Sequence, residues 1–290
     1  MYSMSEILDS IKKFNRERVR QDIVRFIRQK YAEAGVRSAV MGLSGGIDSS
    51  LTLRLAVDAL GPDKIHVLIL PHTSLTPKED IEDAYDLVNE LGVKNVYEIS
   101  IDDIAERFVD KLSDRGVKVD EKAKGNILAR TRMVLLYATA NTVKGFVIGT
   151  GDKSEILIGY YTKYGDGGVD ILPIGDLYKT RVREMGRYLH LPTRIVEKPS
   201  SPRLWPDHMA EKELGVTYDV VDVILYAYID LRMHIGQIYE INGIKQEHVN
   251  IVLKRVVNSE HKRLMPPIPK LFGGMTIGID WRMPHYYETI

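Results

Sequence analysis

The chain has 290 residues, and its 40 Lys and Arg residues balance 40 Asp and Glu residues, so that the formal net charge is zero. A zero net charge argues against a protein that grips nucleic acid through bulk electrostatics, and any anion site must be local. The chain contains no cysteine. This absence excludes disulfides, cysteine-ligated metal sites and a cysteine nucleophile.

The composition is that of a folded globular protein, with 44% hydrophobic and 28% charged residues. We expect one domain over residues 1–290, with a core of about 5–265 and a tail, 266–290, whose order the sequence does not decide. The N-terminal segment is rich in charges and does not resemble a signal peptide. The longest uncharged apolar stretch, 133–143, is far shorter than the roughly 20 residues that span a bilayer. We therefore expect a cytoplasmic protein without membrane contact.

Strand-like and helix-like segments alternate along the first half of the chain. Apolar residues recur at spacings of three and four between Ile7 and Tyr31, which predicts one opening amphipathic helix. Such alternation predicts an α/β fold with a three-layer, Rossmann-like parallel sheet flanked by helices. The expected strands are 38–43, 65–70, 95–101 and 145–150, and the expected helices between them are 47–60, 77–91, 102–112 and 122–143.

The second half of the chain contains two segments of irregular composition. Residues 151–176 are rich in Gly, Asp and Tyr and are expected to form an irregular functional loop. Residues 197–215 carry three prolines and many charges, which indicates a mobile flap. Helices are expected at 178–189, 218–231 and 245–258, and an apolar stripe at 220–228 favours a core or a dimer interface.

The sharpest motif lies between the first strand and the following helix. Adjacent glycines let the backbone approach a ligand, and successive N–H groups, the helix N-terminus and serine hydroxyls favour a pyrophosphate. Because Asp48 would repel that anion, a bridging Mg²⁺ is the simplest resolution. The alternative is a Gly-Gly turn with an ordinary Asp/Ser helix cap. The expected ATP loop comprises Gly42, Leu43, Ser44, Gly45, Gly46, Ile47, Asp48 and Ser49.

The motif Ser44-Gly45-Gly46-Ile47-Asp48-Ser49 resembles the SGGxDS fingerprint of the ATP pyrophosphatases of the adenine-nucleotide alpha-hydrolase-like fold. The resemblance implies that ATP is split between its alpha and beta phosphates. Three later segments, 125–133, 149–155 and 162–170, resemble successive signatures of the NAD synthetase family. With 178–180 and 259–263 in the same order, the resemblance covers about residues 5–265. It implies ATP-dependent amidation of deamido-NAD by free ammonia, giving NAD, AMP and pyrophosphate through an NAD-adenylate.

The resemblance also implies roles for individual residues. It assigns Mg²⁺ to Asp48 and Glu155, and electrostatic catalysis to the same pair together with Lys179. A lysine at a helix start opposes the helix dipole, which itself hints at phosphate binding. The remaining implied ATP contacts are Thr150, Lys179 and Ser201 in the flap, and the implied deamido-NAD contacts are Arg130, Lys163, Asp170, His261 and Lys262.

Each of these residues also has an ordinary structural interpretation. Thr150 fits a strand-end turn, Glu155 a solvated charge, and His261 with Lys262 a helix C-terminus. Arg130 and Arg132 lie two apart on one helix, so only one of them can face a given site. Asp170 is a candidate acceptor of the ammonium proton only through the resemblance.

Two other functions remain open at this point. Another pyrophosphatase of this fold could act on tRNA or a purine nucleotide, although a tRNA thiolase is expected to carry catalytic cysteines and a basic surface. A nucleotide-sensing module could bind ATP without adenylating anything, although Asp48, Glu155 and Lys179 together argue against it. The family resemblance further implies a homodimer with sites at its interface. Without cysteine the chain cannot hydrolyse glutamine by the usual thiolate route, which predicts free ammonia as substrate unless a separate glutaminase subunit supplies it.

Overall fold

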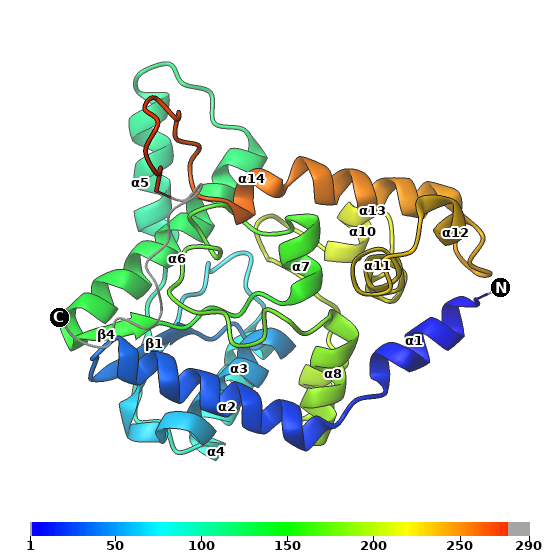
Figure 1. The fold of residues 1–290 in the computed structure, drawn as a ribbon. Helices are drawn as coiled ribbons and strands as arrows, with labels where there is room; N and C mark the ends of the chain where they lie inside the picture. Colours follow the sequence, from blue (N-terminus) through cyan, green and yellow to red (C-terminus); the bar gives the residue numbers. More distant parts are fainter. Residues whose placement is uncertain (1, 278–290) are drawn as a thin grey trace.

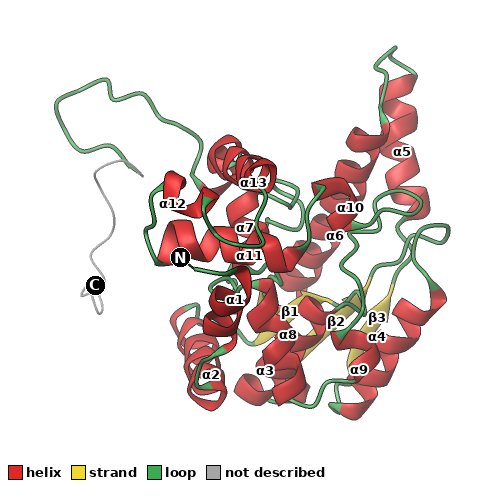
Figure 2. Ribbon diagram, turned by 90° about the vertical axis from the view of Figure 1, so that its right-hand side faces the viewer, coloured by secondary structure: helices red, strands yellow, loops and turns green. Residues whose placement is uncertain are grey.

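In the computed structural model, which describes residues 2–277, a parallel sheet in the order β3-β2-β1-β4 lies at the centre of one half of the molecule (Figures 1 and 2). β1 (Ser38–Gly42) pairs with both β2 (Ile65–Ile69) and β4 (Gly145–Val147), and β2 pairs with β3 (Asn95–Glu98). All pairs are parallel, as the strand and helix alternation predicts. The carboxyl ends of the strands therefore open at one edge of the sheet.

The strands alternate their side chains between two apolar layers. Ala39 and Met41 of β1 pack into a cluster with α3 (Ile47–Leu60) and α8 (Lys179–Tyr188) on one face, whereas Val40 packs on the other face with α6 (Glu121–Val143). Figure 2 shows the sheet between these two helical layers. The helices of the sheet region are α2 (Arg16–Glu33), α3 (Ile47–Leu60), α4 (Lys78–Glu90), α5 (Asp102–Ser113), α6 (Glu121–Val143), α8 (Lys179–Tyr188) and α9 (Thr193–Val196).

A second apolar cluster, built from helices and the loops between them without any strand, lies beside the sheet region. Its centre is α11 (Tyr218–Leu225), in which every residue except Asp219 is buried. The predicted apolar stripe is therefore largely core. The surrounding helices are α1 (Met4–Lys12), α7 (Lys153–Ile158), α10 (Ala210–Leu214), α12 (Ile235–Tyr239), α13 (Gln246–Asn258) and α14 (Glu260–Arg263).

The prediction of one opening helix is wrong, because the helix is interrupted between Lys12 and Arg16 and forms two separate helices. The Asn15 side chain accepts a hydrogen bond from the backbone N–H of Arg18 at 2.9 Å and caps α2. The break lets α1 pack against α11 while α2 packs against α3. Both helices bury one face, so the apolar periodicity continues from one helix into the next. The periodicity therefore does not reveal where the interruption lies.

Four further expectations need correction. β3 ends at Glu98, short of the predicted residue 101, and the loop 151–176 contains α7. The flap contains α10, and the helix predicted for 218–231 changes to a π turn, Tyr226–Asp230, after α11. By contrast, α3 has the predicted bounds, because Gly46 and Gly61 flank it.

Residues 266–277 of the predicted tail contain no helix, and 278–290 lie outside the described residues. Among residues 2–277, no helix combines the length and the apolar character that crossing a membrane requires.

Candidate active site

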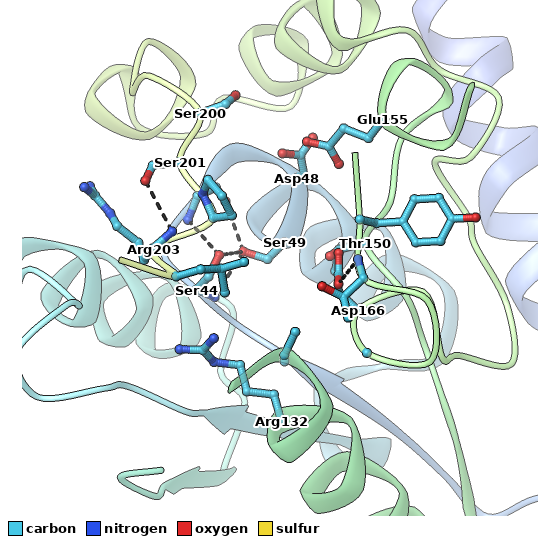
Figure 3. A pocket seen from close by; sticks show the side chains of 18 of the residues that line it. Ser44, Asp48, Ser49, Arg132, Thr150, Glu155, Asp166, Ser200, Ser201 and Arg203 are labelled. Atoms are coloured by element: carbon cyan, nitrogen blue, oxygen red, sulfur yellow. Dashed lines mark hydrogen bonds between the residues drawn. The ribbon is translucent and has the colours of Figure 1, made fainter. Parts of the chain in front are cut away.

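A cavity of about 460 Å³ opens at the carboxyl ends of β1, β2 and β4. Its wall combines the loop after β1, one face of α6, the segment after β4 and the flap 197–215 (Figure 3). In open parallel sheets, ligands bind at this edge, because the loops that leave the strands converge there. The flap places Ser201 in the same cavity wall as Ser44 and Thr150.

The loop after β1 is held in a tight, hydroxyl-rich turn. Gly45 has a φ of +72°, and a Cβ atom there would lie 2.1 Å from the backbone oxygen of Asp80. Only glycine fits this close approach to α4. The Ser49 hydroxyl accepts a hydrogen bond from the backbone N–H of Ser44 at 3.2 Å and donates to the carbonyl of Gly46 at 3.1 Å. The loop is thus preorganised next to the start of α3, where backbone N–H groups favour an anion.

Three carboxylates surround the ammonium group of Lys179, whose side chain is fully buried. Its Nζ lies 2.7 Å from Asp48 Oδ2, 2.9 Å from Asp152 Oδ2 and 2.8 Å from Glu155 Oε1. The Tyr218 ring covers the ammonium at 5.1 Å. We call Lys179, Asp48, Asp152 and Glu155 the acid cluster. A buried ammonium is stable when it is paired in this way, and it fixes the carboxylates in return.

The acid cluster shifts the pKa of its members. Burial lowers the pKa of Lys179, but the three carboxylates outweigh it, and the pKa rises well above its ordinary value. Burial raises the pKa of Asp152 to about 6 against the opposing effect of Lys179. Burial together with the neighbouring Asp152 and Asp48 likewise raises the pKa of Glu155 to about 8. Excess negative charge is therefore concentrated at this wall of the cavity, and a cation would relieve it.

A buried carboxylate beneath the acid cluster aligns the two helices that supply it. Asp222 of α11 accepts hydrogen bonds from the Ser154 hydroxyl at 2.5 Å and from the Thr180 backbone N–H at 2.8 Å. The Ser154 hydroxyl also accepts from the backbone N–H of Lys179 at 2.9 Å. Asp222 therefore joins the starts of α7 and α8, which carry Glu155 and Lys179.

The flap is tied to α4 through ion pairs and to the loop after β1 through a hydrogen bond. Lys198 Nζ lies 2.8 Å from Asp80 Oδ1 and 2.6 Å from Asp83 Oδ2, and it donates to the carbonyl of Gly45 at 3.0 Å. Arg203 adds a 3.2 Å contact to Asp80 Oδ2. The start of the flap is thus held over α4, and the flap can exclude water from the cavity.

The structure gathers most of the predicted ATP residues into one wall. Lys179 is an exception that matters for the chemistry, because its Nζ points to the three carboxylates of the acid cluster and not to the cavity. Gly45 supports the loop without lining the cavity. The predicted residues that line the cavity are Gly42, Leu43, Ser44, Gly46, Ile47, Asp48, Ser49, Thr150, Glu155, Ser201 and Lys262.

The predicted deamido-NAD residues are mostly outside the cavity. Arg130, Asp170 and His261 are exposed, and none of them lines it. Lys163 Nζ donates to the carbonyl of His261 at 2.7 Å, so these two residues lie together. Lys262 reaches the cavity and donates to backbone carbonyls of the segment after β4.

Of the two arginines on α6, Arg132 lines the cavity and Arg130 does not. Asp166 also lines it, whereas Asp170 does not, and an oxygen of Asp170 accepts a hydrogen bond from the Val147 N–H at 2.7 Å. The prediction selected Arg130 rather than Arg132 and did not include Asp166, although both Arg132 and Asp166 lie inside the motifs that carry the family resemblance. An aspartate three residues before a glutamate is a typical helix N-cap pattern, and Asp152 does cap α7. This pattern is the local signal that could have added Asp152 to the predicted site. Nothing local marks Asp222.

The residues present fit a magnesium ion. Asp48 Oδ1 is buried and has no hydrogen-bond partner among the described residues, although Oδ2 is engaged by Lys179. Glu155 lies beside Asp48 (Figure 3). Within residues 2–277 no group of three or more His, Cys, Asp or Glu side chains forms a complete metal cage. That pattern suits Mg²⁺, which is commonly held by one or two carboxylates together with substrate phosphates.

The chain is similar in sequence to known proteins over most of its length. The family model described as NAD synthase matches residues 19–266. The NH(3)-dependent NAD(+) synthetase of Staphylothermus marinus is 48% identical over 255 residues, which are 88% of this chain and 92% of that protein.

Two solved structures show the same fold over their whole length. NMN synthetase from Francisella tularensis has a TM-score of 0.78 and 32% identity, and the match covers 89% of this chain and 100% of that one. NH3-dependent NAD synthetase from Campylobacter jejuni has a TM-score of 0.74 and 28% identity, with coverage of 89% and 100%. The chain belongs to the NAD synthase family.

Proposed function

We propose that this chain amidates deamido-NAD with free ammonia at the expense of ATP, forming NAD, AMP and pyrophosphate. Membership of the NAD synthase family supports an ATP-dependent ligase of NAD synthesis. The observation that carries the proposal is the cavity in which the loop after β1 faces Asp48 and Glu155. The same site therefore offers hydrogen-bond donors that can bind the departing phosphates. It also offers two carboxylates that can bind a cation.

The chemistry has two steps because ammonia does not displace oxide from a carboxylate. In the first step, a nicotinate carboxylate oxygen attacks the alpha phosphorus of ATP, and the bond from that phosphorus to the bridging oxygen breaks. Pyrophosphate leaves with the bond electrons toward Ser44, Gly46 and Ser49. Backbone N–H groups and hydroxyls of the loop stabilise the charge that develops there.

Mg²⁺, held by Asp48 and Glu155, would offset the charge on the phosphates when it is bound. Lys179 positions both carboxylates, as its contacts of 2.7 and 2.8 Å indicate. The proposed contact of Lys179 with ATP requires phosphate oxygens to replace a carboxylate at Nζ. No protein nucleophile takes part in either step, so the chain contributes positioning and electrostatics.

In the second step, ammonia attacks the carbonyl carbon of the NAD-adenylate, and AMP leaves. The nitrogen must lose a proton in the process. Asp166 is better placed than Asp170 to accept it, because Asp166 lines the cavity and is held by the Thr162 N–H at 2.8 Å. The flap protects the adenylate from hydrolysis, since its Ser201 and Trp205 cover the same cavity.

The deciding experiment is incubation of the purified chain with ATP, Mg²⁺, ammonium and deamido-NAD. We expect NAD and pyrophosphate to form in equal amounts, and both to require deamido-NAD. Pyrophosphate release that does not depend on deamido-NAD would point to another substrate of an ATP pyrophosphatase. ATP binding without pyrophosphate release would instead indicate a nucleotide-sensing module.

A mononucleotide is the second candidate substrate, because the protein whose structure gives a TM-score of 0.78 is an NMN synthetase. The two substrates share the nicotinate carboxylate and differ in the attached adenylate. Competition between nicotinate mononucleotide and deamido-NAD under the same conditions separates them. We expect a clear preference for deamido-NAD, and a higher kcat/KM for the mononucleotide would reverse the assignment.

We also propose a homodimer in which the partner completes the dinucleotide site. Arg130, Asp170 and His261 are exposed outside the cavity, and large apolar side chains are exposed on the neighbouring α5 and α6, namely Phe108, Leu112 and Val134. An exposed apolar surface of this kind marks an interaction site. Gel filtration with light scattering should give twice the mass of the 33.0 kDa chain. A fully active monomer would contradict the dimer.

A further inference from the structure

One arginine of the cavity wall, Arg132, is anchored by the fold but forms no ion pair with another described residue. Arg132 lies on α6, and its Nε donates to the carbonyl of Leu70, directly after β2, at 3.0 Å. Among residues 2–277, its two terminal nitrogens have no hydrogen-bond partner, and no carboxylate lies within 4.0 Å of them. The side chain lines the cavity (Figure 3). A guanidinium held in a fixed orientation with free donors is a binding group for an oxyanion.

Several other cations of the cavity are occupied by the protein itself. Lys198 and Arg203 are paired with carboxylates of α4. Lys262 donates to the carbonyls of Gly159 and Tyr161. Lys122 and Arg255 line the cavity from the start of α6 and from α13, away from the strand ends. Among residues 2–277, Arg132 is thus the cation that the fold anchors at the strand ends with its terminal donors unpaired.

Arg132 lies near the loop after β1. Leu136, four residues later and so on the same face of α6, is the nearest neighbour of Gly42, at 3.8 Å from the position of a Cβ atom there. The Leu43 N–H donates to Leu68 of β2 at 2.9 Å, which brings the end of β2 beside the loop. Figure 3 shows Ser44 and Ser49 between Arg132 on one side and Asp48 with Glu155 on the other.

We propose that Arg132 binds the phosphate chain of ATP from the side opposite Asp48 and Glu155. The inference rests on the proposed function for the identity of the nucleotide. The phosphates would then lie between the Arg132 guanidinium and the acid cluster, with the serine loop below them. Arg132 would balance the negative charge that the cavity gains when ATP binds.

Burial lowers the pKa of Arg132 to about 10 in the absence of a bound anion. The guanidinium therefore remains charged at neutral pH, but at a desolvation cost that an anion would relieve. An arginine needed only for its bond to Leu70 would not require free terminal nitrogens facing a cavity.

The test compares nucleotide binding by the unsubstituted chain, Arg132→Met, Arg132→Lys and the surface control Arg18→Met, whose arginine side chain is 80% exposed. Calorimetry would use α,β-methylene-ATP, adenosine and deamido-NAD as separate ligands, so that no turnover occurs. We expect Arg132→Met to raise the dissociation constant of the ATP analogue about 10- to 100-fold. Adenosine and deamido-NAD should bind as before. The affinity of Arg132→Lys for the ATP analogue should lie between those of Arg132→Met and the unsubstituted chain, because lysine keeps the charge but lacks the planar guanidinium.

Unchanged binding of the ATP analogue by Arg132→Met would overturn the proposal. Weaker binding of adenosine as well, with a lowered melting temperature, would show a structural role and would also overturn it. Loss confined to deamido-NAD would assign the guanidinium to the other substrate and refute the ATP contact. If the unsubstituted chain forms no NAD but its binding of the ATP analogue still depends on Arg132, the proposed function fails and this inference stands.

Discussion

Lys179 Nζ donates to Asp48 Oδ2 at 2.7 Å across a separation of 131 residues in the chain. Asp48 belongs to the loop and helix that receive the phosphates, whereas Lys179 begins α8, and the contact joins these two parts of the site. Lys179 also holds Glu155, so one buried ammonium positions both proposed magnesium ligands.

Asp48→Asn should reduce NAD formation by at least about 100-fold, because it removes a charge opposed to Lys179 and a proposed magnesium ligand. The fold should survive, since the amide oxygen can still accept from Lys179. Activity assays with circular dichroism would check both points. Asp63→Asn, at a side chain that is 80% exposed, is the matched control. Near-normal turnover of Asp48→Asn would refute the metal assignment.

Lys179→Met should destabilise the protein by roughly 3–5 kcal/mol, because it leaves buried carboxylates without a cation. Denaturant unfolding measures the loss, and Lys94→Met at an 82% exposed side chain serves as control. The double variant Lys179→Met with Asp152→Asn should regain part of the stability, since it removes one of the unpaired charges. Additive losses in the double variant would show that the two residues do not interact energetically.

Gly45→Ala should abolish ATP binding, because its Cβ would lie 2.1 Å from the Asp80 carbonyl and displace the loop. Gly92→Ala is the control for backbone strain alone. Gly92 has a φ of +69° and nothing within 4 Å of its Cβ position, so the change should cost only about 1–2 kcal/mol of stability. Titration with an ATP analogue and thermal melting compare the two variants. Equal effects of the two substitutions would mean that the contact with α4 does not shape the loop.

Asp222→Asn should flatten the dependence of stability on pH. Burial raises the pKa of Asp222 to about 7. Between its ordinary value near 4 and this pKa, the folded state holds a proton that the unfolded state has released, so the free energy of unfolding falls as pH rises. Asparagine stays neutral. Its amide oxygen can accept from the Thr180 N–H, and its amide nitrogen can donate to the Ser154 hydroxyl oxygen, which reverses the direction of that bond. The variant should therefore melt a few degrees higher than the parent chain at pH 8.

Thermal melts from pH 5 to pH 8 would measure this difference. Asp219→Asn on the same helix, at a side chain that is 43% exposed, is the control and should follow the parent chain. A parent melting temperature that rises between pH 5 and pH 8 relative to Asp222→Asn would contradict the sign.

Glutamine should not replace ammonium as nitrogen source, because the chain contains no cysteine to release ammonia from it. NAD would be measured with glutamine in ammonia-free buffer and, in parallel, with ammonium chloride. NAD formation from glutamine by the isolated chain at a comparable rate would overturn this expectation.

The sequence by itself determined the features that depend on neighbouring residues. The parallel sheet follows from alternating strands and helices, and α3 has its predicted bounds because glycines flank it on both sides. The loop after β1 is recognisable for the same reason, since its glycines and serines act within a few residues of one another. The family followed from such local motifs, and the match over residues 19–266 confirmed it.

Only the tertiary structure decided how the separate motifs combine. The acid cluster joins the starts of α3, α7 and α8, and no spacing within one segment predicts that Lys179 would face three carboxylates. Packing of α6 on the sheet likewise decided that Arg132 lines the cavity while Arg130 stays exposed. Long-range charge pairing and helix orientation depend on the whole core. A local pattern can supply the residues for a site, but the packing of distant elements determines which of them meet.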